Sequence, residues 1–288
     1  MTKNLLTAIC VSVMSLTYAQ NVLVGKVKQE NNLGLPYVNI GIPDKSVGTV
    51  SDSNGNYTLK LTDEIKESDE VVFSHIGYKT VKHTVSSLRK TNNLTFEPDE
   101  NIIDNVVINV KNKKPKEKKL GRKNIGLDLT FFGFYSDYEH DVVDDALSKE
   151  TGMLVIVKNN SLATALNFKI FSNQYKHLKF RVNFYKIEKG LPTELLFTNK
   201  NILFDISDSY KGWFKVDLTD YDIYLDESLG EIAVTIQWLE SEKMEENSKF
   251  FSIPVSMVGG TQYVRNKAMD SWKKHKQALS FYLDVTEY

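Results

Sequence analysis

The chain has 288 residues, of which 25% are charged and 41% are hydrophobic, and its formal net charge is −1. This composition is that of a globular protein and excludes collagen-like, disulfide-rich and charge-rich disordered chains. The near balance of acidic and basic residues argues against a nucleic-acid-binding protein, which usually has a basic face and a high isoelectric point. The length suits about two domains, because single domains are most often ~100–150 residues long.

Residues 1–19 have the layout of a secretory signal peptide. Lys3 precedes an apolar run over residues 5–16, and the small residue Ala19 closes the segment. The run is shorter than the ~20 apolar residues of a membrane-spanning helix. We expect cleavage after Ala19, which would place the mature protein in the periplasm, on the outer-membrane surface or outside the cell. Cleavage also removes Cys10, the single cysteine, so we expect no disulfide and no thiol chemistry. Because the apolar run continues past Cys10, we do not expect a lipid anchor there.

Short strands separated by turns are predicted from residue 22 to residue 110. Residues 35–42 alternate with the period of two that is typical of a strand with one buried face. The pair Asn54-Gly55 between two alternating stretches predicts a hairpin in which both turn residues have positive φ. Tyr57, Leu59 and Leu61 share one face of the returning strand, and we expect them to pack on Val38 and Ile40. The other expected strands cover residues 22–27, 70–74, 94–96 and 102–110.

A change in composition marks the end of this first domain, which we place at residues 20–110. Residues 111–123 contain eight basic residues, one acid and one proline. Such a charge block cannot bury a core, so residues 111–124 are predicted to form a basic linker. An extended soluble spacer is the favoured interpretation, and weak contact with anionic lipid or lipopolysaccharide headgroups is the alternative.

Residues 125–288 are again rich in predicted strands and are expected to form a second antiparallel β-sandwich, similar to a jelly roll. Two short helices are candidates at 141–149 and 267–277, the second being a polar loop otherwise. Seven aromatic residues in strand patterns are expected in the core, namely Phe168, Phe171, Phe180, Phe184, Trp213, Phe214 and Trp238. The expected strands are 128–135, 153–158, 165–171, 180–187, 202–206, 212–216, 231–238, 250–256 and 280–286.

Four segments of the first domain resemble the carboxypeptidase-regulatory-like domain, a family abundant in exported and surface proteins of Bacteroidetes. They are Gly25-Lys26-Val27, residues 35–40, residues 48–57 and residues 73–78, in the order of the family. The resemblance implies an all-β chain that begins with a seven-stranded prealbumin-like sandwich and has an accessory role. The second half, through residues 180–185, 213–218 and 281–285, is similar to the sandwich that often follows this domain in exported Bacteroidetes proteins.

The residues of familiar hydrolases are not spaced as those enzymes require. A zinc carboxypeptidase has Glu three residues after its first His, whereas none of the five histidines has an acid at that position, and no His-Glu-x-x-His occurs. The sequence also has no Gly-x-Ser-x-Gly elbow and no phosphate loop. Two Ser-x-x-Lys matches, at Ser87 and Ser271, have no companion motifs and are interpreted as chance. The stretch from Asp52 lacks the Gly and Glu of a calcium loop, so a turn is favoured there.

Two weak candidates for a site remain. Asp137, Glu139 and Asp141 belong to an acidic cluster of the kind that hard cations prefer, although a solvated loop is the simpler interpretation. Trp272 lies in a polar basic stretch and is a candidate for an exposed ligand-stacking residue, with a structural role as the alternative.

We therefore expect an exported, non-catalytic module of a Gram-negative cell envelope that recognises a protein or glycan through its loop tips, without a cofactor. The alternative is a hydrolase of peptide or cell-wall material whose acidic site lies within residues 137–145. A purely structural spacer is a third possibility. The identity of the envelope partner is not encoded in any motif that we recognise.

Overall fold

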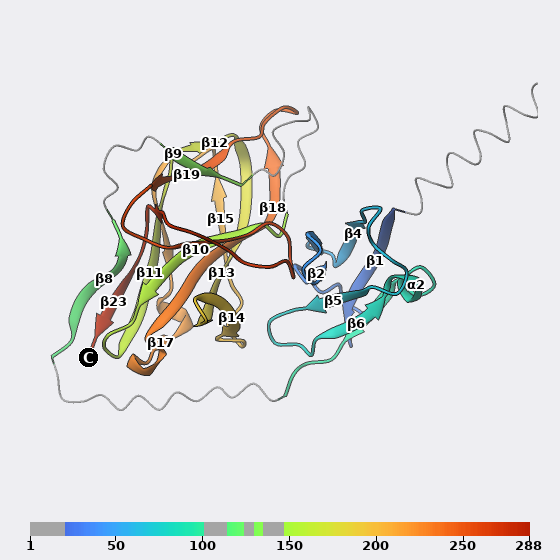
Figure 1. Cartoon of the computed structure of the whole chain (residues 1–288), viewed down its shortest axis with the longest axis horizontal. Coiled ribbons are helices and arrows are strands. Elements are labelled where there is room, and N and C mark those ends of the chain that lie inside the picture. Colours follow the sequence, from blue (N-terminus) through green and yellow to red (C-terminus); the bar gives the residue numbers. More distant parts are fainter. Residues whose placement is uncertain (1–20, 101–113, 124–129, 135–146) are drawn as a thin grey trace, which may run out of the picture. The chain divides into compact units, whose positions relative to one another are not determined.

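The computed structural model describes residues 21–100, 114–123, 130–134 and 147–288, in two compact units (Figure 1). Of these residues, the first unit comprises 21–98 with 267–271, and the second comprises the remainder. The predicted signal peptide, the strand expected at 102–110 and the acidic cluster of Asp137, Glu139 and Asp141 lie outside the described residues. Within the described residues, no helix has the length and apolar character needed to span a membrane.

The first unit is a sandwich of seven strands in two sheets, as the family resemblance implied. One sheet has the order β4-β1-β7, with β1 and β7 parallel, and the other has the antiparallel order β3-β2-β5-β6. A single turn of helix, α2 (Val85–Leu88), follows β6, and the Thr84 hydroxyl caps it by accepting from the Ser87 amide at 3.2 Å. The strands are β1 (Val22–Gln29), β2 (Asn39–Ile42), β3 (Val47–Val50), β4 (Asn56–Lys60), β5 (Glu70–Ser74), β6 (Val81–Thr84) and β7 (Asn93–Phe96).

The core of the first unit follows the alternation of its strands. Tyr57, Leu59 and Leu61 are buried in one cluster with Val38 and Ile40, which confirms the predicted packing. Because these side chains come from β2 and the residue before it, and from β4 and the residue after it, the cluster joins the two sheets.

The turn at Asn54-Gly55 does not form the predicted hairpin, because β3 and β4 belong to different sheets. Asp52 organises this connection: its Oδ1 accepts from the amides of Asn54 and Asn56, each at 2.8 Å. Gly55 has a φ of 80°, whereas Asn54 keeps a negative φ, so the turn is not the one with two positive φ angles. The alternating pattern identified both strands correctly but carried no information about which partner each strand takes.

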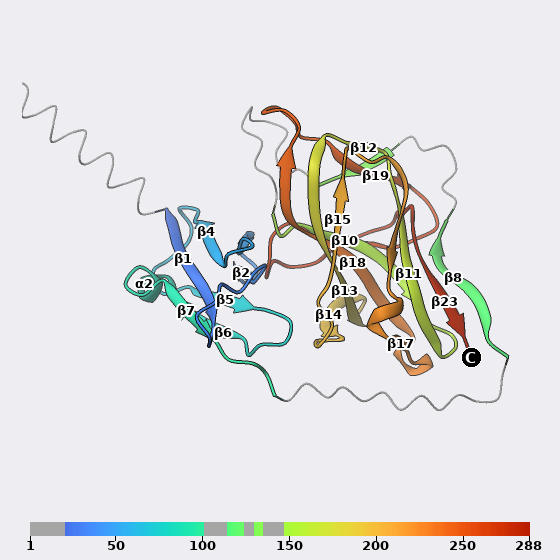
Figure 2. The same ribbon diagram turned by 180° about the vertical axis from the view of Figure 1, so that it is seen from behind.

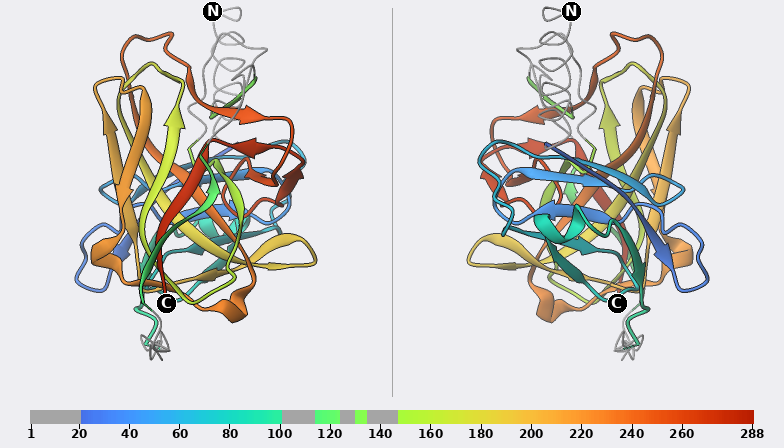
Figure 3. Two further views of the ribbon diagram at one scale, coloured as in Figure 1. Left: turned by 90° about the vertical axis from the view of Figure 1, so that its left-hand side faces the viewer. Right: turned by 90° about the vertical axis from the view of Figure 1, so that its right-hand side faces the viewer.

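The second unit consists of three antiparallel sheets, which confirms the all-β expectation. The seven-stranded sheet has the order β14-β13-β18-β10-β20-β21, and β15 also pairs with β13. The five-stranded sheet has the order β16-β11-β23-β8, and β17 also pairs with β11. The four-stranded sheet has the order β12-β19-β22, and β9 also pairs with β19. The views in Figure 3 show these strands from two sides. The strands are β8 (Lys116–Arg122), β9 (Thr130–Gly133), β10 (Glu150–Ile156), β11 (Ser161–Ile170), β12 (Ser172–Asn173), β13 (Tyr175–Glu188), β14 (Leu191–Leu196), β15 (Ile202–Ser207), β16 (Gly212–Asp217), β17 (Ile223–Leu225), β18 (Glu231–Lys243), β19 (Phe251–Ser256), β20 (Gln262–Arg265), β21 (Lys273–His275), β22 (Ala278–Leu279) and β23 (Phe281–Glu287), and two short 3₁₀ helices cover Thr219–Tyr221 and Glu227–Leu229.

The linker prediction is wrong for residues 116–122. These residues form β8, which pairs along the whole of β23 at the edge of the five-stranded sheet (Figure 2). Leu120 lies opposite Leu283 and packs against the core, and Lys119 forms an ion pair with Asp284, its partner in the ladder. Lysines are common on edge strands because their charge opposes pairing with another chain. The basic composition therefore belongs to an edge strand.

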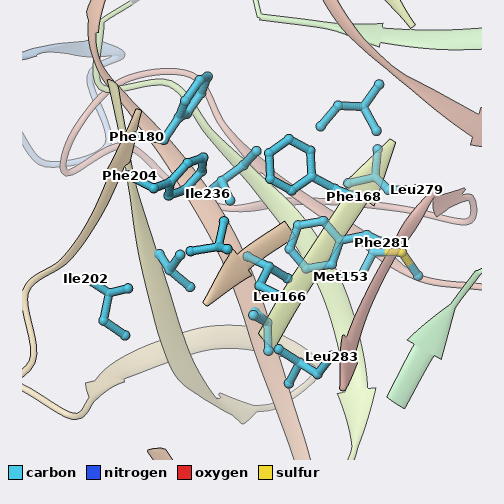
Figure 4. Close-up of a cluster of buried hydrophobic side chains, with 14 of the residues drawn as sticks. Met153, Leu166, Phe168, Phe180, Ile202, Phe204, Ile236, Leu279, Phe281 and Leu283 are labelled. Carbon is cyan, nitrogen blue, oxygen red and sulfur yellow. The ribbon is translucent and has the colours of Figure 1, made fainter. Parts of the chain in front are cut away.

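The main core of the second unit contains side chains of the seven-stranded and five-stranded sheets (Figure 4). On β13, Phe180, Val182 and Phe184 are buried in this core, and Arg181 and Asn183 alternate with them. All nine strands expected in this half are present, within the described residues. The helix that was one of two alternatives for residues 267–277 is absent, since this stretch contains the strand β21.

Candidate functional site

A cleft of about 580 Å³ opens in the second unit where β9, β12 and β19 meet, and Figure 1 shows these strands together at one end of the unit. Connections between strands contribute to it, among them those from β11 to β12, from β12 to β13, from β15 to β16 and from β18 to β19. The cleft is lined by Phe131, Gly133, Lys149, Phe171, Ser172, Asn173, Gln174, Lys211, Phe250 and Ser252.

Two phenylalanine rings form an exposed wall of this cleft. The rings of Phe131 and Phe171 stack with their centroids 3.9 Å apart and their planes at 20°. Their exposed fractions are 41% and 48%, although apolar rings of this size usually lie in the core. The prediction that Phe171 is a core residue is wrong, because β11 ends at Ile170 and Phe171 lies in the bend between β11 and β12.

Polar side chains lie beside the two rings. The hydroxyls of Ser172 and Ser252 are 2.6 Å apart and hydrogen-bond to each other across the β12–β19 pair. Gln174 Oε1 accepts from the amides of Lys249 and Phe250, each at 3.1 Å, which fixes the orientation of the side-chain amide. The cleft thus combines an exposed, mutually stacked pair of rings with oriented hydroxyl and amide groups.

Two lysines place positive charge at the cleft. Lys149 is almost fully buried, its Nζ donates to Gly133 O at 3.1 Å, and it lies 5.1 Å from the centroid of the Phe132 ring. Lys211 is exposed in the connection between β15 and β16. The described lining residues include no acidic side chain.

Trp272 lies in a different place from this cleft and is half-buried. The Arg265 guanidinium lies 4.7 Å from the centroid of its ring, in a cation–π contact. The ring also meets Tyr185 edge to face at 5.4 Å. These contacts support a structural role for Trp272 and make it a poor candidate for stacking on a ligand.

Beneath Trp272 lies a buried network around Glu150. Arg265 Nη2 donates to Glu150 Oε2 at 2.5 Å, and Asn183 Nδ2 donates to Oε1 at 2.8 Å. The hydroxyl of Thr235 also donates to Oε1, and the hydroxyl of Tyr185 lies 3.4 Å from Oε2. Four strands, β10, β13, β18 and β20, contribute to the network. It fixes the register of the sheet and offers no exposed nucleophile.

The charges of this network change the acidity of its members. Burial raises the pKa of Tyr185 far above its ordinary value, and the nearby Glu150 carboxylate acts in the same direction. Burial acts to lower the pKa of Arg265, but the attraction of Glu150 and the hydrogen bonds outweigh it and hold that pKa above its usual range. The Arg265 guanidinium therefore stays charged, and a neutral tyrosine lies beside it.

No metal-binding group was found in the part of the chain that the structure describes: no three or more histidine, cysteine or acidic side chains lie close enough together to hold an ion. The acidic cluster of Asp137, Glu139 and Asp141 is outside that part, so its role stays a prediction.

Comparison with protein families assigns the first unit. Residues 23–108 match the model of the CarboxypepD_reg-like domain, and the observed seven-stranded sandwich agrees with that match. The first unit is a carboxypeptidase-regulatory-like domain. Such a domain is a non-catalytic β-sandwich module, and the family model covers less than a third of the whole chain.

The motif residues of the carboxypeptidase-regulatory-like domain have structural roles. The buried Ser51 hydroxyl accepts from the Val38 amide and donates to Leu35 O, both at 2.9 Å. The Tyr78 ring meets the rings of His75 and Phe96 edge to face, at 5.3 and 6.2 Å. These contacts show that the motif residues stabilise the fold of the domain.

Other comparisons add little. No curated protein matches the chain. Among solved structures, the infectious bursal disease virus Gx strain is similar at 12% identity and a TM-score of 0.26, over 93% of this chain and 55% of that chain. The major pilin subunit BcpA of Bacillus cereus is similar at 11% identity and a TM-score of 0.18, over 90% of this chain and 68% of that chain. The chain spans about half the length of the viral protein, and none of these likenesses is close enough to carry an argument.

Proposed function

We propose that the protein is a non-catalytic binding module of the bacterial cell envelope, exported through a cleaved signal peptide. It recognises a glycan or a protein through the cleft between β9, β12 and β19 of its second unit. The carboxypeptidase-regulatory-like domain is the accessory module of this arrangement and the second unit is the recognition module.

The exposed ring pair of Phe131 and Phe171 is the observation that carries this proposal. A stacked aromatic pair has little reason to remain in water, and exposed apolar groups rimmed by polar ones often mark binding sites. The cleft lies at loop ends, where β-sandwiches commonly place their binding residues. The accessory family of the first unit supports the same interpretation.

Affinity capture from envelope extract tests the proposal. The chain without residues 1–19 is immobilised, and the bound material is compared with that held by a double variant, Phe131→Ala with Phe171→Ala. Lys215→Ala is the matched control, because Lys215 is an exposed lysine of β16 that does not line the cleft. We expect one or more partners that the parent and the control retain and the double variant loses.

Two results would contradict the proposal. Capture that is the same for the parent and the double variant would show that the cleft is not the recognition surface. Turnover of a peptide or cell-wall substrate, lost in Asp141→Ala or Asp144→Ala, would favour the hydrolase alternative instead.

A further inference from the structure

We propose that the edge of the seven-stranded sheet at β21 binds an acidic, extended segment of a partner protein as an added strand. This surface is separate from the cleft, since none of the described residues that line the cleft belongs to β21. Three observations carry the proposal: the open position of β21 in its sheet, the basic side chains on both faces of the strand, and the lack of acidic partners for them.

β21 is the last strand of its sheet, in the order β14-β13-β18-β10-β20-β21. It pairs antiparallel with β20, and within the described residues no strand is hydrogen-bonded to its other side. Because a strand has amide and carbonyl groups along both of its sides, those on the outer side of β21 are open to pairing. An extended peptide that adds one strand to a sheet uses an edge of this kind.

Basic side chains lie on both faces of this edge. Lys274 shares its face with Tyr263, its partner on β20. Lys273 and His275 alternate with Lys274 and therefore point to the opposite face. All three side chains are exposed, as is that of Lys276, which follows the strand. A flat anionic surface such as a membrane would contact one face only, whereas the side chains of an added strand lie on both.

The lysines of this edge have no acidic partners. In the part of the chain that the structure describes, no ion pair involves Lys273, Lys274 or Lys276. The connection from β21 to β22 contains no acid. The turn between β13 and β14, which approaches Lys274, adds one acid and one base, Glu188 and Lys189, whose charges cancel. Three lysine charges therefore remain available to a partner.

Lysines on an edge strand commonly protect a sheet against pairing with other chains. This protection acts against apolar and basic strands, whereas the same charges attract an acidic strand, since opposite charges directly across two strands stabilise their pairing. The other basic edge strand, β8, is a weaker candidate because it contains Glu117 and because its Lys119 already pairs with Asp284. β21 is therefore the edge at which charge favours an acidic strand.

Three fluorescently labelled peptides test the proposal with the full chain without residues 1–19. The first is Thr-Val-Glu-Glu-Glu-Val-Thr, and the second has glutamine in place of each glutamate, so that it loses the charge and can still form a strand. The third is the acidic peptide with N-methyl groups on all three glutamates, which keeps the charge and removes backbone donors on both of its sides. Fluorescence anisotropy at about 0.1 M salt should show the first peptide binding at least about tenfold more tightly than either of the others.

Paired variants then connect the binding to β21. The double variant Lys273→Gln with Lys274→Gln removes two charges from the edge, and we expect it to weaken binding of the acidic peptide about tenfold. The matched control, Lys116→Gln with Lys118→Gln, removes two lysines from β8 and should leave binding within about twofold of the parent. All four lysines are exposed, so both variants should unfold at the same urea concentration as the parent.

Four outcomes overturn the proposal. They are equal binding of the glutamate and glutamine peptides, equal binding of the N-methylated peptide, binding that the Lys273 and Lys274 double variant retains, and no binding of the acidic peptide. In the last case, retention of the protein on phosphatidylglycerol vesicles would identify a lipid surface as the partner of these lysines instead. None of these results bears on the cleft, which is tested by the Phe131 and Phe171 double variant.

Discussion

Removal of Arg265 should destabilise the second unit because it leaves the Glu150 carboxylate buried without its cation. Glu150 is fully buried, and Arg265 donates to its Oε2 at 2.5 Å. Breaking a buried ion pair by deleting one partner typically costs about 3–5 kcal/mol. The carboxylate would keep the donors from Asn183 and Thr235, so we expect Arg265→Leu to cost about 3 kcal/mol, the lower end of that range.

The double variant Glu150→Met with Arg265→Leu separates the charge from the packing. Replacing both members of a buried pair by apolar residues of similar volume is often close to neutral. Asn183 and Thr235 would then lose their acceptor, which adds about 1–3 kcal/mol for each donor left without a partner. We therefore expect the double variant to be destabilised by less than the sum of the two single changes.

Urea unfolding followed by tryptophan fluorescence measures these differences for the second unit alone. The three tryptophans, Trp213, Trp238 and Trp272, all lie in that unit. A loss below about 1 kcal/mol would refute the reasoning.

Three further predictions concern single buried groups. Burial raises the pKa of Tyr57 to about 12, so the contribution of Tyr57 to the stability of the first unit should be complete below about pH 10 and be lost as the pH rises toward 12. The Tyr57→Phe variant should lose less stability over the same pH range. The NMR signals of buried valine methyl groups measure the unfolding of this unit. Ser51→Ala removes a hydroxyl that bonds two buried backbone groups and should cost about 1–3 kcal/mol in the same assay, whereas Ser53→Ala in the exposed turn should cost under about 0.5 kcal/mol. A Cβ on Gly152 would lie 1.9 Å from Val234 O, so Gly152→Ala should lower the free energy of unfolding by about 1–3 kcal/mol. Urea unfolding followed by tryptophan fluorescence measures this change. An unchanged urea midpoint would contradict the close approach of the two strands.

Period-two alternation was sufficient to locate most strands. The stretches around Val38, Tyr57, Phe180 and Val234 alternate because every second side chain enters a main hydrophobic core, and each of them contains a strand in the structure. The fold class therefore followed from local pattern and from the family resemblance of the first domain.

Strand partners and some strands could not be predicted in this way. The turn at Gly55 signals a reversal, yet the two strands beside it enter different sheets, since pairing depends on residues distant in the sequence. Residues 116–122 were missed because the eight basic residues and one acid of the basic run conceal one apolar contact, that of Leu120 opposite Leu283. At a sheet edge, a single buried apolar side chain is enough to hold a strand in place when backbone hydrogen bonds to the neighbouring strand supply the other contacts.

The candidate cleft was invisible in the sequence for a related reason. Phe131 and Phe171 are forty residues apart, and each lies in a strand-like pattern that favours core packing. Only the pairing of β9 and β12 with the same strand, β19, brings the two rings together. Similarly, Trp272 occurs in a basic stretch, and its partner Arg265 is identified only by the position of β20.

The assignment of residues 116–122 to β8 determines where the chain can be shortened. A truncated protein that begins at residue 125 would leave the whole of β23 without its outer neighbour. The open amide and carbonyl groups of Phe281–Glu287 would then offer a template for strands of other molecules, beside the apolar side chains of Leu283 and Val285. Recombinant fragments of the second half should start before Lys116, and self-association of a shorter fragment would reflect the missing strand and not a natural oligomer.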